Sequence, residues 1–274
     1  MGTPLREALD GVLVALRAAG VENPRLDAEL LVAFALGVPR TRLHTDPDLR
    51  VGGAAVRTLQ AAVRRRAFER EPLAYITGRR GFRRLDVSVD RRALIPRPET
   101  ELLVEVAFEL PAGARVLDLG TGSGAVALAV KDERPDLSLT ASDVSADALS
   151  LAGENARRLG LEIELVQSDL LSGLPGRFFE VILANLPYVE EGAPLAPEIA
   201  RHEPALALLA GADGLDVFRR LLSGDVPAPL LALEVGAGQA GAVASLARAA
   251  GFGEVQVRPD LAGIDRVVVA RRPC

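Results

Sequence analysis

Residues 116–124 read Val-Leu-Asp-Leu-Gly-Thr-Gly-Ser-Gly, and a helix-like apolar stretch follows them as far as Lys131. A short apolar run that leads directly into a glycine-rich turn and a helix is typical of a strand-loop-helix unit. Glycines at such a turn let the backbone approach a ligand closely, because no Cβ stands in the way. Ligands of open α/β sheets bind at the carboxyl ends of the strands. The loop therefore predicts a cofactor site formed by Gly120, Thr121, Gly122, Ser123 and Gly124.

Strands and helices are expected to alternate from Ala114 to the end of the chain. Such alternation predicts a mostly parallel sheet with helices on both faces, so the expected fold class is α/β. No helix separates the last two expected strands, which predicts a hairpin and one antiparallel strand, placed at the edge of a seven-stranded sheet. The expected strands are residues 115–119, 137–142, 163–167, 181–184, 230–235, 254–258 and 266–270, and the expected helices are 124–131, 146–159, 215–222 and 239–249.

Acidic residues follow the second and third of these strands. Asp143 ends the second strand, where a carboxylate can accept hydrogen bonds from both hydroxyls of a ribose. Nicotinamide-dependent enzymes use an acid in the same place and a similar glycine loop, so these two features indicate an adenosine-type ligand without identifying it. Asp169 and its apolar neighbour Leu170 follow the third strand, and they suit the edge and the face of an adenine ring. This combination favours S-adenosylmethionine as the cofactor.

The fourth strand leads into Asn185-Leu186-Pro187-Tyr188. This sequence resembles the motif of methyltransferases that act on planar NH2 groups. An amide nitrogen is a poor nucleophile, but it has two hydrogens to donate, and the Asn185 side-chain oxygen and the Leu186 carbonyl can accept them. Two acceptors would hold the nitrogen in place and favour the charge that develops during transfer. Pro187 stiffens the loop, and the Tyr188 ring can lie against a planar substrate group.

The chain before residue 98 differs in character from the rest. Residues 1–70 predict a helical bundle: Thr3-Pro4 and Asn23-Pro24 are expected to begin helices, Gly37 ends one, and a third helix fits residues 51–70. Within residues 71–97, Phe82, Leu85, Val87 and Val89 alternate with charged side chains, which predicts a β-hairpin connector. The expected domains are therefore the helical bundle 1–70, the connector 71–97 and the α/β domain 98–274.

Charge and composition restrict the class of protein. The 274-residue chain has a net charge of −5, yet residues 1–97 hold 18 arginines against 11 acidic residues. This basic N-terminal part suggests an acidic macromolecular partner. No apolar run reaches the ~20 residues that span a bilayer, no secretory signal is visible, and the single cysteine is Cys274. We therefore expect a cytoplasmic protein without a metal site or a membrane contact. We also expect a monomer.

With these motifs together, the chain resembles the release-factor glutamine N5-methyltransferases, the HemK-like family within the class I S-adenosylmethionine-dependent methyltransferases. The resemblance covers nearly the whole chain and rests on the helical domain, the glycine loop, the Asn185–Tyr188 motif, and the blocks 71–78, 95–101, 203–208 and 213–215. It implies a Rossmann-like sheet preceded by a helical domain that recognises the substrate. It implies as substrate the glutamine of the Gly-Gly-Gln tripeptide in class I peptide-chain release factors, with no direct contact to nucleic acid. Arg97, in the block 95–101, is a further candidate for binding the substrate.

Two residues depart from the family pattern. Leu186 stands where the family usually has proline, which costs the loop some rigidity but leaves the carbonyl in place. Leu170 stands where an aromatic residue is frequent, so weaker stacking on the adenine is expected.

Three alternative functions remain open from the sequence. Ribosomal RNA adenine N6-methyltransferases share the Asn-Leu-Pro-Tyr motif, but they lack a preceding helical domain. A nicotinamide-dependent oxidoreductase would explain the glycine loop and Asp143, but it would leave Asn185–Tyr188 without a role. A binding protein that has the cofactor-binding fold but no enzymatic activity would leave both the glycine loop and Asn185–Tyr188 without a role.

Overall fold

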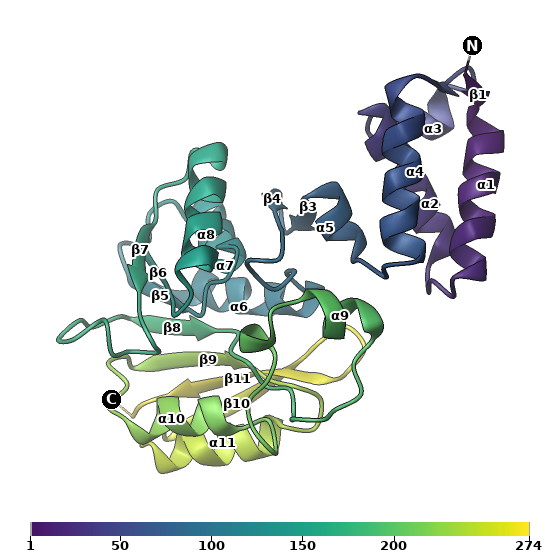
Figure 1. The fold of residues 1–274 in the computed structure, drawn as a ribbon. Helices are drawn as coiled ribbons and strands as arrows, with labels where there is room; N and C mark the ends of the chain where they lie inside the picture. Colours follow the sequence, from purple (N-terminus) through teal and green to yellow (C-terminus); the bar gives the residue numbers. More distant parts are fainter. Residues whose placement is uncertain (1, 274) are drawn as a thin grey trace. The chain divides into compact units, whose positions relative to one another are not determined.

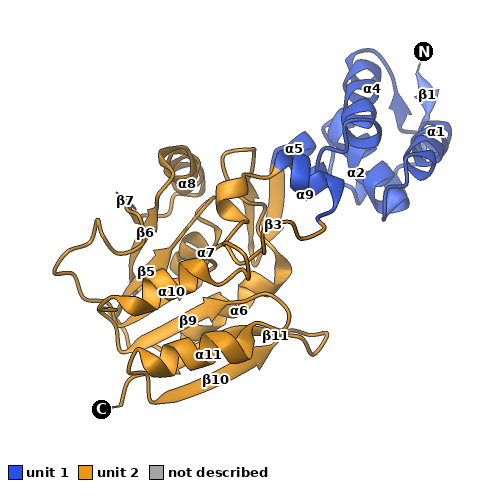
Figure 2. Cartoon of the chain, turned by 60° about the horizontal axis from the view of Figure 1, so that its bottom comes forward, with its two compact units in different colours: residues 1–78, 195–202 blue, residues 79–194, 203–274 orange. Residues whose placement is uncertain are grey.

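The computed structural model describes residues 2–273, so the single cysteine, Cys274, lies outside the described residues. The chain forms two compact units, coloured separately in Figure 2. The helical unit contains the chain up to Gly78 together with Leu195–His202. The sheet unit contains Arg79–Pro194 and the chain from Glu203 onward. The main division, between Gly78 and Arg79, thus falls inside the segment 71–97 that the sequence presents as a connector.

The helical unit is built from α1 Leu5–Ala18, α2 Pro24–Leu36, α3 Arg42–Thr45, α4 Ala54–Ala67 and α5 Leu73–Thr77. As predicted, Pro24 begins α2, and Gly37 ends it in the left-handed conformation, with φ of 64°. The prediction that the first helix begins at Thr3-Pro4 is wrong, because α1 begins at Leu5. Thr3 and Pro4 form strand β1, which pairs with β2 Arg50–Val51, and this pairing keeps Thr3 extended. Pro4 is therefore the residue that precedes α1.

One helix of this unit comes from a distant part of the sequence. The chain leaves the sheet unit after Pro194, forms α9 Pro197–His202, and returns at Glu203. The buried guanidinium of Arg66 donates hydrogen bonds to Asp27 on α2 at 2.7 Å and to Glu198 on α9 at 2.9 Å. A buried arginine needs such partners, because an unpaired charge in the interior is costly. The helical unit is therefore completed by residues that lie outside the expected domain 1–70.

The sheet unit contains a seven-stranded sheet in the order β10-β11-β9-β8-β5-β6-β7. Its strands are β5 Arg115–Leu119, β6 Ser138–Asp143, β7 Glu164–Gln167, β8 Val181–Ala184, β9 Leu230–Glu234, β10 Glu254–Pro259 and β11 Asp265–Arg271. The strand pairs β7-β6, β6-β5, β5-β8 and β8-β9 are all parallel, which confirms the predicted α/β class. A separate hairpin, β3 Arg79–Phe82 and β4 Leu85–Ser88, precedes the sheet.

The expected position of the antiparallel strand is wrong. Strand β11 is antiparallel to both neighbours, but it lies between β9 and β10, so β10 forms the edge. Burial explains the order: Val267–Ala270 on β11 are all buried, whereas β10 exposes Glu254 and Gln256. An edge strand tolerates charged side chains that a central strand cannot carry.

Helices cover both faces of the sheet (Figure 1). One face is covered by α6 Glu101–Val106, α7 Ala125–Glu133 and α8 Ala146–Leu159, and the other by α10 Asp216–Ser223 and α11 Ala240–Ala249. Short 3-10 helices occur at η1 Pro98–Thr100, η2 Ala107–Glu109 and η3 Ala205–Ala207. Among residues 2–273, no helix combines the length and the apolar character that crossing a membrane requires. The architecture brings the loops after β5, β6, β7 and β8 to one end of the sheet.

Candidate functional site

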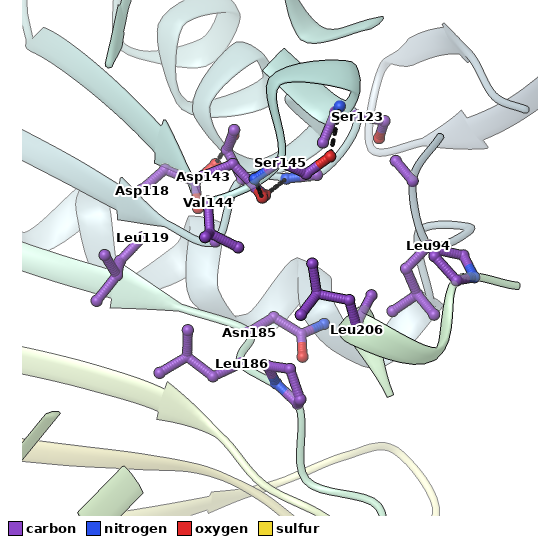
Figure 3. Close-up of a pocket in the computed structure, with 18 of the residues that line it drawn as sticks. Leu94, Asp118, Leu119, Ser123, Asp143, Val144, Ser145, Asn185, Leu186 and Leu206 are labelled. Carbon is purple, nitrogen blue, oxygen red and sulfur yellow. Dashed lines mark hydrogen bonds between the residues drawn. The ribbon is translucent and has the colours of Figure 1, made fainter. Parts of the chain in front are cut away.

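A cavity of about 290 Å³ lies at the carboxyl ends of β5, β6, β7 and β8. Figure 3 shows Asp143 and Ser145 on one side of it and Asn185 and Leu186 on the opposite side. Apolar side chains complete the wall, among them Leu94 and the largely exposed Leu206. The sequence-predicted residues that line the cavity are Gly120, Thr121, Gly122, Ser123, Asp143, Asp169, Leu170, Asn185, Leu186 and Pro187.

The glycine loop follows β5 in a conformation that favours glycine. Gly120 and Gly122 have φ values of 75° and 57°, in the left-handed region. A Cβ on Gly120 would lie 3.1 Å from Cδ2 of Leu186, so the loop packs closely against the opposite wall. Gly124, by contrast, is absent from the lining. A Cβ there would lie 3.1 Å from the Cβ of Ala152, which indicates that Gly124 allows α7 and α8 to approach each other.

Asp118 holds this loop from inside the sheet. Its carboxylate Oδ2 accepts hydrogen bonds from the Thr121 hydroxyl at 2.6 Å and from the Ala127 backbone N–H at 3.1 Å. Burial raises the pKa of Asp118 to about 6. The residue ties the end of β5 to the first turn of α7, and this contact fixes the loop that passes between them.

Asp143 presents its carboxylate to the cavity. Oδ2 accepts a hydrogen bond from the Gly122 N–H and Oδ1 accepts one from the Ser145 N–H, both at 2.9 Å. Burial raises the pKa of this carboxyl, against the opposing effect of the backbone N–H groups of Ser145, Gly122 and Val144. A carboxylate has about four acceptor positions, so each oxygen can accept another hydrogen bond. Asp143 is therefore held rigidly with acceptor capacity left for a ligand with two hydroxyls.

Asp169 and Leu170 both line the cavity, but they are held there by different contacts. The exposed carboxylate of Asp169 accepts a hydrogen bond from Arg220 at 2.7 Å, so it is partly engaged within the protein. Leu170 has φ of 49°, an uncommon value for a residue other than glycine. The Ser168 hydroxyl donates a 2.6 Å hydrogen bond to the Leu170 carbonyl and helps to hold this conformation. Strained backbone of this kind gathers at functional sites.

Asn185 stands at the end of β8 and is held by a residue from a distant segment. Its side-chain nitrogen Nδ2 donates a hydrogen bond to the Thr100 hydroxyl at 3.1 Å. Thr100 is the last residue of η1 and is only 4% exposed. Beside Asn185, the side chain of Leu186 is buried in the core cluster of the sheet unit. The loop after β8 is therefore anchored on both sides.

Tyr188 does not line the cavity. Its hydroxyl donates a long hydrogen bond of 3.5 Å to Glu234 at the end of β9, and its carbonyl accepts one from Gln239 at 2.9 Å. Burial raises the pKa of Tyr188 to about 12. A Cβ on Gly214 would lie 2.3 Å from the Tyr188 carbonyl oxygen, so glycine at that position makes room for the loop. This arrangement gives Tyr188 a part in fixing the loop.

Arg97, like Gly124 and Tyr188, is absent from the lining. Its guanidinium donates a 2.5 Å hydrogen bond to the buried carboxylate of Glu203. The same carboxylate accepts a hydrogen bond from the Ile95 N–H at 3.2 Å. Arg97 thus helps to join the segment 95–97 to Glu203, at the start of the segment that leads to Leu206.

Sequence reasoning missed three polar residues around the site: Thr100, Asp118 and Glu234. Asp118 and Glu234 share a signal that was visible, since each is an acid within a strand whose other residues are almost all apolar. Thr100 gives no such signal, because a threonine before a helix is usually a cap.

Two models of known protein families match separate parts of the chain. A family model described as the PrmC N-terminal domain matches residues 7–78, and one described as the methyltransferase small domain matches residues 98–202. A solved methyltransferase from Pyrococcus furiosus has 17% sequence identity and a TM-score of 0.52, and the match covers 69% of this chain and 90% of that chain. This structural likeness supports the methyltransferase fold.

Full-length relatives identify the family. A release factor glutamine methyltransferase from Moorella thermoacetica is 43% identical, with 98% of both chains covered. Proteins of the same name from Deinococcus radiodurans and Cereibacter sphaeroides are 42% and 44% identical, with at least 97% of each chain covered. The resemblance inferred from the sequence is confirmed, and the alternatives of an RNA methyltransferase and an oxidoreductase are not favoured. The chain belongs to the family of release factor glutamine methyltransferases.

Proposed function

We propose that this protein transfers a methyl group from S-adenosylmethionine to the side-chain amide nitrogen (N5) of a glutamine in class I peptide-chain release factors. The glutamine is that of the Gly-Gly-Gln tripeptide. The observation that carries the proposal is the near-complete match to relatives of that name, together with Asn185 at the wall of the cavity. Because release factors act on cytoplasmic ribosomes, the enzyme would work in the cytoplasm.

The lining of the cavity suits S-adenosylmethionine. Asp143 would accept hydrogen bonds from the ribose hydroxyls, and the loop from Gly120 to Ser123 would lie along the ligand without a Cβ at its two glycines. Asp169 and Leu170 would meet the adenine. When bound, S-adenosylmethionine supplies an electrophilic methyl group on a positively charged sulfur. The volume of about 290 Å³ is close to the lower end of the range for small-molecule sites.

Asn185 would orient the acceptor amide. Because its Nδ2 already donates to Thr100, its Oδ1 is the end of the side chain that remains for an N–H of the substrate. The Leu186 carbonyl would accept the second N–H. An amide nitrogen held by two acceptors keeps its lone pair directed at the methyl group, and both acceptors favour the positive charge that develops on it. The methylated nitrogen then releases one proton to solvent, so this scheme requires no dedicated base.

The helical unit would supply recognition of the intact release factor. A glutamine side chain is too small to select one protein through Asn185–Tyr188 alone. Helix α4 has an exposed face suited to a protein partner, on which Arg57, Ala61, Arg64 and Phe68 follow one another at helical spacing. Phe68, just after the helix, is 80% exposed, which is unusual for an aromatic side chain. Arginine and aromatic residues are enriched where protein partners bind.

Labelled S-adenosylmethionine tests the proposed substrate class. The enzyme is incubated with a class I release factor, with ribosomal RNA, or with both together, and the label in each polymer is counted. The proposal predicts label in the release factor and none above background in the RNA. Label that enters the RNA, or neither polymer, would refute it.

A further inference from the structure

Leu206 is an exposed apolar side chain in the wall of the cavity. It is 64% exposed, more than any other leucine or valine of the lining. A single exposed leucine on an ordinary protein surface needs no explanation. Leu206 differs because it borders the same cavity as Asn185, the residue proposed to hold the substrate amide. A substrate that enters the cavity would therefore cover it.

The chain enters the short helix η3, which carries Leu206, from a fixed point. Glu203 is only 7% exposed, and its carboxylate accepts hydrogen bonds from the Ile95 N–H at 3.2 Å and from Arg97 at 2.5 Å. Hydrogen bonds from a guanidinium to a carboxylate are among the strong ones, and breaking a buried pair is costly. The first end of η3 is consequently held in place.

The other end of η3 is fixed to the loop that carries Asn185. The Leu208 carbonyl accepts a hydrogen bond from the Val189 N–H at 2.8 Å, and the Ala210 N–H donates one to the Val189 carbonyl at 2.9 Å. Val189 directly follows the motif that begins at Asn185. Because both of its ends are held, η3 presents Leu206 at a defined place beside the acceptor loop.

The proposed function leaves part of the substrate glutamine without a partner. Asn185 and the Leu186 carbonyl account for its amide, but two methylene groups join that amide to the main chain. Methylene groups gain from contact with an apolar surface. In the view of Figure 3, the Leu206 side chain lies between those of Asn185 and Leu94. An apolar stem that leads outward from Asn185 would find an apolar surface there.

We propose that Leu206 is a substrate-binding residue that packs against the methylene stem of the glutamine. The inference deepens the proposed function and rests on it, because it concerns the same glutamine whose amide Asn185 would orient. The contact would remove both the stem and the leucine from water. It belongs to the glutamine itself, so it would be made equally by an intact release factor and by a short peptide.

Leu206→Ala tests the contact through its effect on KM. Burial of two methylene groups is worth roughly tenfold in affinity, so we expect kcat/KM to fall by about tenfold with the release factor and with a Gly-Gly-Gln peptide. With the release factor the loss should lie in KM, and kcat should stay near the wild-type value. An apolar contact of this kind is the same in the ground state and in the transition state, and its removal raises KM alone.

Two further variants separate the apolar contact from the mere presence of a side chain. Leu206→Met conserves the volume and the apolar character, and it should keep nearly wild-type kinetics. Leu206→Asp should lose more than Leu206→Ala, because its charge would have to give up water beside the stem. Calorimetry with S-adenosylhomocysteine should give wild-type affinity for all three variants, which also shows that they are folded.

Leu261→Ala is the matched control. Leu261 belongs to the same unit and is fully exposed, but it is absent from the lining of the cavity. Its removal should leave KM and kcat at the wild-type values with both substrates. This variant shows whether the loss of any exposed leucine affects the enzyme.

Several results would overturn the inference. They are a wild-type KM in Leu206→Ala, a loss confined to kcat, and a loss seen with the intact factor but not with the peptide. Weaker binding of S-adenosylhomocysteine by Leu206→Ala would also overturn it, because Leu206 would then belong to the cofactor site. Failure of the proposed function would look different, because the wild-type enzyme itself would methylate neither substrate.

Discussion

Asn185 and Thr100 are joined by a 3.1 Å hydrogen bond, although 85 residues separate them in the sequence. Thr100 is only 4% exposed, so water competes little for its hydroxyl and the contact is stronger than it would be at the surface. The bond connects the loop after β8 to η1, the short helix that precedes α6. The residue expected to hold the substrate is thus itself held by the protein core.

Replacing Asn185 with alanine should abolish methyl transfer while leaving the cofactor site intact. The change removes the acceptor proposed for one substrate N–H, and removal of a comparable oxyanion-hole donor lowers turnover by roughly 10²–10³-fold. Single-turnover measurements with a saturating release factor would give the loss, and calorimetry would show unchanged affinity for S-adenosylhomocysteine. An Asn185→Ala enzyme with wild-type turnover would remove this residue from the mechanism.

Asp143→Ala should weaken S-adenosylmethionine binding by roughly 1.5–3 kcal/mol, the range for hydrogen bonds to a charged group. The carboxylate is held by the Gly122 and Ser145 N–H groups and keeps acceptor capacity for a ribose. Asp169→Ala is the matched comparison, since Asp169 also lines the cavity but is exposed and paired with Arg220. We expect Asp169→Ala to lose less affinity for S-adenosylmethionine than Asp143→Ala, as measured by calorimetry. Equal affinity of Asp143→Ala and the wild type would contradict the ribose assignment.

Glu234→Gln should stabilise the fold at alkaline pH. The pKa of Glu234 is about 7 in the folded protein and has the ordinary value of 4.5 in the unfolded chain, so the folded protein binds the proton more tightly. Protonation of Glu234 therefore stabilises the fold, and this contribution is fully present below pH 4.5. This contribution is lost as the pH rises through 7 and amounts to about 3.5 kcal/mol, at about 1.4 kcal/mol per pKa unit. Denaturant unfolding should give similar stabilities for the variant and the wild type at pH 5, and a more stable variant at pH 8. A difference that does not change with pH would show that Glu234 does not titrate in this range.

Charge reversal on α4 should slow the methylation of the intact release factor but not that of a short peptide. The double variant Arg57→Glu and Arg64→Glu should lower kcat/KM for the release factor by about tenfold, equivalent to about 1.4 kcal/mol, and Phe68→Ala should act in the same direction. Activity on a Gly-Gly-Gln peptide should not change. The effect of the charge reversals should shrink at high salt, because screening shortens the reach of exposed charges.

Arg6→Glu, an exposed arginine on α1, serves as the control for net charge. It should leave both activities near the wild-type value. If the α4 variants methylate the intact factor at the wild-type rate, the docking role of this face is wrong.

The sequence predicted those parts of the site that follow a strand directly. The glycine loop, Asp143 and Asn185 each come immediately after a buried strand, and the parallel sheet brings such positions together. The family pattern also placed the helical domain before the sheet. The placement of the three loops needed only local periodicity and the rule that ligands bind at the carboxyl ends of strands.

Other features depend on tertiary structure and could not be predicted in this way. The contact of Thr100 with Asn185 and the pairing of Arg66 with Glu198 join residues that are 85 and 132 positions apart. The location of β11 inside the sheet follows from the burial of its residues, and a hairpin in the sequence does not say which of its strands forms the edge. The acid Glu234 was visible in the sequence, but its complete burial and its contact with Tyr188 are seen only in the structure.

The most direct test of the central claim is to locate the transferred methyl group. After reaction of the full-length enzyme with S-adenosylmethionine and a class I release factor, tandem mass spectrometry of the digested factor would identify the modified atom. We expect one methyl group on the side-chain amide of the glutamine in the Gly-Gly-Gln tripeptide, and none after reaction with Asn185→Ala. A methyl group on any other residue, or an unmodified factor after reaction with the wild-type enzyme, would contradict it.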